Sequence, residues 1–472
     1  MLRRHALGLA ATGPILVGKT LVKLGLKTSP EAWRKLLGVN LRGEPSKFGL
    51  SAFGLRVPTD ELPARLHAFL RIEPEAAYAL THTRPLCTRH ACDTIDLVVQ
   101  RFDATGTLTG IDSLLDPNRP SGLDEATHNS VHASVVSAYR ATARAAEAVR
   151  PLALVATAAR GMNPAAVAYL TRLAKATCLA IEPLDPTRRF EPPPLVERRG
   201  LGHNAYTFAA RTDAAAGTAD LWGTAHHVAA DGVPFQELVT RLERAWGTEP
   251  VAFPAAGTVF GPRCSHHAGE RAVYESLSFH DFAPLLRLRK TVNAELGLGV
   301  PVVALLLWVL AKQPEFAATK FAGTVDVPVT ATRERCVDLV SRRPADFNGD
   351  LAAFARSFLD GVAASRERRS PVQAAGADLA HLPPRLLRAL LEAIPDQLAD
   401  TFGEVGLSVI RDAKVFTAPL SDVAYPGGFL AVGGMGLPAA DGPVGALSVK
   451  GTREQAVTYP SVLARALSTC GC

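Results

Sequence analysis

Near the middle of the chain, two adjacent histidines are followed at fixed spacing by an aspartate and a glycine, in the run His226-His227-Val228-Ala229-Ala230-Asp231-Gly232. An imidazole titrates near neutral pH and can move one proton per turnover, so His227 is a candidate general base. The small residues before Asp231 permit a tight loop, which that carboxylate can hold by pairing with an arginine. Gly232 tolerates backbone angles that other residues resist. No other stretch of the sequence carries so specific a chemical signal.

The flanking residues predict how this turn is positioned. Ala205 to Arg211 and Ala219 to Ala225 favour two antiparallel strands joined by a glycine-containing loop. Pro234 favours the start of a helix that continues to about Trp246. The turn is therefore expected between the end of a strand and the beginning of a helix.

This HHxxxDG turn resembles the active-site motif of the CoA-dependent acyltransferase superfamily. That superfamily includes chloramphenicol acetyltransferase, the dihydrolipoamide acyltransferase cores and the peptide-synthetase condensation domains. The resemblance implies that His227 is the general base, that His226 is the first histidine of the motif, and that Asp231 is a structural brace paired with an arginine. The candidate arginines are Arg84, Arg89 and Arg101.

The resemblance extends into the second half of the chain. Phe282 to Leu310 looks like the paired helices that precede a central strand in the family, and Gly406-Leu407-Ser408-Val409 looks like one of its short strands. In the acyltransferase cores a hydroxyl residue of this region helps to stabilise the oxyanion. The resemblance therefore makes Ser408 and Thr417 the candidates for that role.

The two halves of the chain also contain a weak internal repeat. Aligning Leu221 with Leu447 places Pro234 opposite Pro460, and each proline follows a strand and a turn. In this register Arg453 stands opposite the motif histidine, so the second copy is expected to lack the chemistry. We predict its final helix from Pro460 to Leu467.

The resemblance implies an α/β (α+β) fold with two chloramphenicol-acetyltransferase-like lobes. Each lobe should hold a mixed, mostly antiparallel sheet flanked by helices, with an active-site tunnel at the lobe interface. A chain of 472 residues exceeds what one core usually serves, and a proline-containing linker from Gly247 to Gly269 separates the halves. The predicted segments are a basic amphipathic N-terminal region (1–59), a first lobe with the motif (60–262) and a second lobe with a degenerate motif (263–472).

Composition excludes several classes of protein. Hydrophobic residues form 47% and charged residues 20% of the chain, and a net charge of +6 is spread over its length, which argues against nucleic-acid binding. Seven scattered cysteines are typical of a reducing compartment, so we expect a cytoplasmic protein. Residues 15–37 form a basic amphipathic pattern that fits either a membrane surface or a helix packed on the protein.

The resemblance to the CoA-dependent acyltransferases implies acyl transfer of the EC 2.3 type. The donor is a coenzyme A or carrier-protein thioester acting as co-substrate, and the acceptor is a small molecule or lipid with a hydroxyl, amine or thiol. We expect no bound cofactor and no metal, assign no cofactor-binding residue, and expect a monomer or small oligomer.

Other interpretations stay open. One is an acyltransferase-fold scaffold or binding protein without activity, and another is a metal-dependent hydrolase that uses His226, His227 and Asp231. His128 and His132 lie four residues apart on a predicted helix, a spacing that can bind a metal, but the sequence lacks the Glu of an HExxH pattern.

Overall fold

The structure is a computed structural model. It describes residues 47–73, 76, 78–83, 86–92, 95–143, 151–190, 201, 205–226, 232–246, 252–268, 271–328, 335–366, 383, 385–386, 389, 403–410, 413–417 and 425–471. The amphipathic pattern predicted at residues 15–37 lies outside these residues. None of the helices within the described part is long and apolar enough to cross a membrane.

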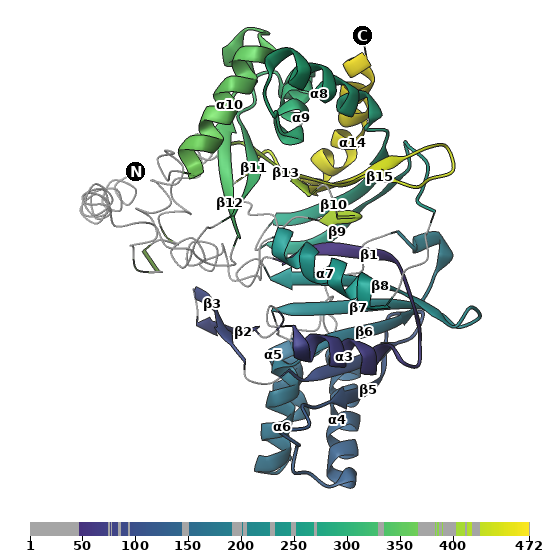
Figure 1. The fold of residues 1–472 in the computed structure, drawn as a ribbon. Helices are drawn as coiled ribbons and strands as arrows, with labels where there is room; N and C mark the ends of the chain where they lie inside the picture. The colour runs from purple at the N-terminus through teal and green to yellow at the C-terminus, as the bar shows by residue number, and fades with distance from the viewer. Residues whose placement is uncertain are drawn as a thin grey trace.

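Two seven-stranded sheets form the framework of the molecule (Figure 1). In spatial order the first sheet contains β14 (Val415–Thr417), β1 (Lys47–Pro58), β8 (Thr218–His226), β7 (Tyr206–Asp213), β6 (Thr177–Pro183), β4 (Leu97–Phe102) and β5 (Leu108–Leu114). The second contains β9 (Val259–Ala268), β10 (Arg271–His280), β16 (Val444–Gly451), β15 (Phe429–Leu437), β13 (Val405–Ile410), β11 (Phe321–Pro328) and β12 (Arg335–Arg342). A separate hairpin joins β2 (Tyr78–Thr83) to β3 (Leu86–Ala91).

The two sheets have the same topology when they are compared strand by strand in that order. In each sheet the first four strands pair antiparallel, the next two pairings are parallel, and the edge pairing is antiparallel again. The structure therefore confirms the expected fold class of two lobes with mixed, mostly antiparallel sheets flanked by helices.

Helices accompany the strands of both lobes. The helices numbered before β9 are α3 (Leu62–Ile72), α4 (Glu125–Ala143), α5 (Pro151–Ala158), α6 (Pro164–Lys175) and α7 (Gly232–Trp246). Those after it are α8 (Ala283–Leu296), α9 (Val302–Ala311), α10 (Leu351–Arg366) and α14 (Arg453–Ser468). Figure 1 shows α8, α9, α10 and α14 gathered at one end of the molecule and α4 and α6 at the other. The near-continuous apolar run of α9 is buried from Val303 to Leu310, as expected for a core helix.

One hydrophobic cluster is shared between the lobes, and a second cluster lies within the second lobe. Trp222 and Ala209 of the first sheet belong to the same buried cluster as Leu277, Phe279 and Ala446 of the second. Two polar contacts add to this cluster. The Phe253 amide donates to the Pro438 carbonyl over 2.8 Å, and the Lys414 ammonium lies 2.6 Å from a Glu243 carboxylate oxygen.

Strand pairing crosses the predicted segment boundaries, which stay predictions. β1 falls within the predicted N-terminal segment, yet it pairs with β8 along almost its whole length. β14 belongs to the second half of the chain and completes the first sheet by pairing with β1. Residues 259–268, predicted as linker, form β9 instead. Because β9 is an edge strand, Pro262 interrupts no ladder on its outer side.

Two helix ends also differ from the prediction. The Asn163-Pro164 pair predicts a helix that continues to about Ala180. The helix that Asn163 caps through Ala166 N ends at Lys175, and Thr177 to Ala180 belong to β6. The final helix begins at Arg453, not at Pro460, because Thr452 and Gln455 form a capping box.

Candidate active site

The first residue of the motif, His226, is the last residue of strand β8. From Ala219 onward every residue of β8 is buried, since the strand pairs with β7 on one side and β1 on the other. His226 ends the strand with an exposed fraction of 1%, and its amide donates to the Ala205 carbonyl over 2.8 Å. Its ring is therefore positioned by the strand, inside the protein.

The structure describes the two ends of the motif, His226 and Gly232, but not the residues between them. His227 and Asp231, the predicted base and its brace, lie outside the described residues. The chain re-enters the structure at Gly232, the first residue of α7. The motif therefore connects the end of a buried central strand to the start of a helix, as the sequence predicts. The predicted helix start at Pro234 is two residues late, and the proline lies in the first turn, where its missing N–H costs no helical hydrogen bond.

A glycine on β8 lets α7 pack closely below the motif. A Cβ on Gly223 would come within 2.9 Å of the Phe235 ring and 3.3 Å of Phe208. Phe235 in turn packs against Tyr206 of β7, with ring centroids 5.6 Å apart. This close contact fixes the helix that follows the motif against the strand that precedes it.

A row of uncharged side chains crosses the first sheet two residues before His226. Thr207 and Thr224 are direct partners on β7 and β8, and their hydroxyls form a short hydrogen bond. Gly49 of β1 pairs with Thr224 on one side and with Thr417 of β14 on the other. Thr417, one of the two predicted oxyanion candidates, is 5% exposed. The structure therefore places it in the same sheet as the motif strand, two strands away from it.

Ser408, the other oxyanion candidate, lies in the second lobe. It stands on β13 opposite Ala431 and is half-buried between Leu407 and Ile410. Among the described residues its hydroxyl makes no hydrogen bond, and no contact joins it to His226. Within the described part of the chain, the structure thus neither places Ser408 beside His226 nor gives its hydroxyl another partner.

The three candidate arginines have different outcomes. Arg84 lies outside the described residues, and only the backbone of Arg89, in β3, is described. Arg101 forms an ion pair with Asp112, whose carboxylate is 3.0 Å from its Nε, and both side chains are at least half exposed. Arg101 is therefore a surface residue in the structure, and the arginine that pairs with Asp231 stays a prediction.

Sequence reasoning missed several buried ionic groups among the described residues. Arg172 donates two hydrogen bonds to Asp96, at 2.5 and 2.6 Å, and Arg189 donates one to Asp220 of β8, at 2.8 Å. Arg211 pairs with Glu182 at 2.9 Å, and Arg263, Glu275 and Lys450 form a group in the second sheet. The available signal was a charged residue at an inward position of an otherwise apolar strand.

Comparisons with known proteins concern the fold. The chain is similar to the structure of TRI101 from F. sporotrichioides complexed with coenzyme A and T-2, with a TM-score of 0.45, 13% identity, and 89% and 94% of the two chains covered. It is also similar to the trichothecene 15-O-acetyltransferase TRI3 from Fusarium sporotrichioides, with a TM-score of 0.45 and 10% identity over 92% of this chain and 94% of that one. A third similar structure is the wax ester synthase/diacylglycerol acyltransferase from Marinobacter aquaeolei VT8, with a TM-score of 0.40 and 14% identity over 94% of this chain and 98% of that one.

Its structural neighbours have the CoA-dependent acyltransferase fold. This is the superfamily whose motif the sequence resembles. No protein-family model matches the chain, and no curated protein sequence matches it significantly.

Proposed function

We propose that this protein is an acyltransferase that moves an acyl group from a coenzyme A or carrier-protein thioester to a hydroxyl, amine or thiol acceptor. One observation carries the proposal: the HHxxxDG run begins at the end of the buried strand β8 and is followed at once by α7. The sheet that contains β8 contributes to the hydrophobic cluster that spans the two lobes, so the motif begins close in sequence to residues of the lobe interface.

In this mechanism His227 acts as the general base. It removes the proton from the acceptor while the acceptor attacks the thioester carbonyl, and a tetrahedral oxyanion forms. The C–S bond then breaks, and the thiolate leaving group recovers the proton from the imidazolium. A hydroxyl donor stabilises the oxyanion, with Ser408 or Thr417 in this role, and Asp231 braces the loop. Coenzyme A thus enters as a co-substrate, and the chemistry needs no covalent acyl-enzyme.

The test is thiol release from acyl-CoA by the purified protein, with a panel of hydroxyl, amine and thiol acceptors. We expect release by the wild type that depends on the acceptor and is lost in His227→Ala. Equal inertness of both proteins over a broad panel would support an inactive scaffold, and loss of activity on adding a chelator would support the hydrolase interpretation.

A further inference from the structure

A cavity of about 440 Å³ lies in the first lobe between α4 and β5, the edge strand of the first sheet. Small-molecule sites typically measure roughly 300–1,000 Å³, so this cavity is large enough for a small ligand. Its wall is formed by consecutive residues of β5, from Thr109 to Ile111, and by one face of α4 between His132 and Arg140. The wall contains no residue of the HHxxxDG motif, so acyl transfer leaves this cavity without a role.

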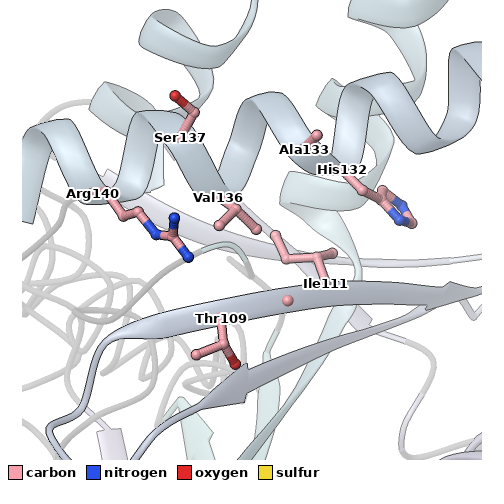
Figure 2. Close-up of a pocket in the computed structure, with 8 residues that line it drawn as sticks. Thr109, Ile111, His132, Ala133, Val136, Ser137 and Arg140 are labelled. Carbon is pink, nitrogen blue, oxygen red and sulfur yellow. The ribbon is translucent and has the colours of Figure 1, made fainter.

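The Arg140 guanidinium forms one end of the cavity. The residue is exposed, and within the described part of the chain its side chain makes no hydrogen bond or ion pair. Figure 2 shows this side chain extending from α4 toward β5, on the side of Thr109. The carboxylate of Asp103 accepts hydrogen bonds from Thr105 and Thr107, which lower its pKa, and the charge of Arg140 lowers that pKa further. Because Asp103 has these other partners, the guanidinium N–H groups remain available to a negatively charged ligand.

The middle of the cavity is apolar. Ile111 of β5 is buried and Val136 of α4 is half-buried, and Figure 2 shows both side chains in the space between the strand and the helix. His132 closes the other end. Its ring already has two partners, because Nε2 lies 3.0 Å from the Tyr169 hydroxyl and the ring also hydrogen-bonds to the backbone of Ile111. A ligand would therefore meet one cation at one end and mostly hydrocarbon along the rest.

The histidine pair of α4 does not turn this cavity into a metal site. His128 and His132 both direct Nε2 toward the Tyr169 hydroxyl, at 2.6 and 3.0 Å, so both are used in hydrogen bonds. No group of three or more His, Cys, Asp or Glu within the described ranges could hold a metal ion. The charge of Arg140 also repels cations. The cavity therefore favours an anion.

The edge of β5 beside the cavity is poorly suited to an added peptide strand. Among the described strands β5 pairs with β4 alone, so its outer edge could in principle accept another chain. Its register shifts, however, because Arg101 pairs with Gly110 while the next residue, Phe102, pairs with Leu108. Thr109 is thus the extra residue of a β-bulge, which disrupts the regular ladder that a new strand needs. A compact ligand fits this place better than an extended peptide.

We propose that this cavity binds a small amphipathic monocarboxylate, with the carboxylate on Arg140 and the hydrocarbon chain against Ile111 and Val136. A guanidinium matches the planar geometry of a carboxylate and can bind both of its oxygens. A single cation with Asp103 nearby favours a monoanion over a dianion such as a phosphate monoester. From Arg140 to His132 the wall follows α4 for about 12 Å, at a rise of about 1.5 Å per residue. This length suits a medium-length chain such as that of octanoate.

The experiment titrates the full chain with octanoate and follows binding by saturation-transfer difference NMR, which detects weak ligands. Octan-1-ol supplies the chain without the charge, acetate the charge without the chain, and octyl phosphate a dianion on the same chain. We expect saturable binding of octanoate, and dissociation constants at least about tenfold higher for octan-1-ol and acetate, since each lacks one of the two contacts. Octyl phosphate should also bind more weakly than octanoate. The measurement needs no acyl transfer, so it does not depend on the proposed function.

Two variants and a control locate the binding. Arg140→Gln changes an exposed residue and should weaken octanoate binding about tenfold, and Val136→Ser should weaken it about fivefold by removing apolar contact. Arg160→Gln removes the same charge from an exposed arginine outside the cavity wall and should bind as the wild type does.

The proposal is overturned if octanoate shows no saturable binding to the wild type. It is also overturned if folded Arg140→Gln or folded Val136→Ser binds octanoate as the wild type does, because the ligand then occupies another part of the molecule. Equal weakening in Arg160→Gln and Arg140→Gln would likewise contradict it, since only the net charge of the protein would then matter.

Discussion

The two lobes share one topology, but equivalent positions in their sheets hold uncharged residues in the first lobe and mostly charged residues in the second. In the first lobe the row before the motif contains Thr207, Thr224, Gly49 and Thr417 in neighbouring strands. The strands of matching position in the second lobe place Phe429, Lys450, Glu275 and Arg263 in that row. In the repeat register Thr224 aligns with Lys450. Uncharged hydroxyls therefore precede the motif in one lobe, and a buried ion network occupies the equivalent place in the other.

This difference shows how a duplicated turn can lose its chemistry while its lobe keeps its fold. Burial would raise the pKa of Glu275, but the neighbouring charges of Lys450 and Arg263 outweigh it and lower the pKa, so this buried carboxyl stays ionised. Beyond this row, α14 starts directly at Arg453. The residue opposite Asp231 is Val457, an exposed residue of that helix. The second copy thus has a capped helix where the first has the motif.

The largest expected effect comes from breaking the ion network. Glu275→Ala leaves the Lys450 ammonium buried without its carboxylate, so we expect a loss of about 3–5 kcal/mol of stability. Urea unfolding of this variant beside Glu295→Ala, an exposed acid of α8, measures the loss. A cost below about 1 kcal/mol would mean that the row is not held by these charges.

The second prediction concerns acid sensitivity of the second lobe. Burial lowers the pKa of His280 to about 4, and its Nε2 lies 2.8 Å from the Ser278 hydroxyl. Above pH 6.5 the ring is neutral in both folded and unfolded chains. Below it the unfolded chain binds the proton first, so stability falls by up to about 3 kcal/mol between pH 6.5 and 4. His280→Gln should flatten that part of the stability profile, and an unchanged slope would contradict the assignment.

A smaller loss of stability is expected from removing the hydrogen bond that Ser276 makes to α14, the helix of the second copy. Pro460 lies inside α14 and cannot donate to the Ala456 carbonyl, and the Ser276 hydroxyl donates to that carbonyl instead over 2.6 Å. Ser276→Ala should therefore cost about 1–3 kcal/mol, because a buried acceptor is left without a donor. Ser461→Ala, an exposed serine of the same helix, is the control and should change the midpoint of thermal unfolding little.

The smallest effect should come from the hydroxyl row of the first lobe. Thr224→Val removes a hydroxyl that bonds to the Thr207 hydroxyl and donates to the Thr207 carbonyl over 3.3 Å. These are bonds between neutral groups and side-chain size is nearly constant, so we expect a loss of about 1 kcal/mol. Urea unfolding in parallel with Glu275→Ala compares the two rows directly. A loss as large as that of Glu275→Ala would remove the distinction between them.

Local sequence patterns predicted the elements whose signals are local. The hairpin of β7 and β8 follows from alternating apolar residues around a glycine-containing loop, and α9 follows from an unbroken apolar run. The N-cap of α6 at Asn163 follows from an Asn-Pro pair. Each of these depends on residues within a few positions of one another, so the sequence alone carries the information.

The elements that were missed depend on distant partners or on weak local cues. β14 is three residues long and becomes a strand only by pairing with β1, more than 350 residues earlier. The prolines around β9 suggest a linker, and only its edge position makes them compatible with a strand. Within the candidate site, the strand before the motif and the helix after it could be predicted. The placement of Thr224 and Thr417 in one row could not, because it depends on how β8, β1 and β14 pair.

The most direct test of the account compares the two repeat positions, His227 and Arg453. The steady-state rate of acyl-CoA thiol release, with an acceptor that the wild type uses, is measured for His227→Ala and Arg453→Ala. We predict that kcat of His227→Ala falls by about 10²–10⁴-fold and that Arg453→Ala retains the wild-type value, since only the first lobe carries the base. Undiminished kcat in His227→Ala, or an equal loss in both variants, would contradict the claim that the chemistry belongs to the first copy alone.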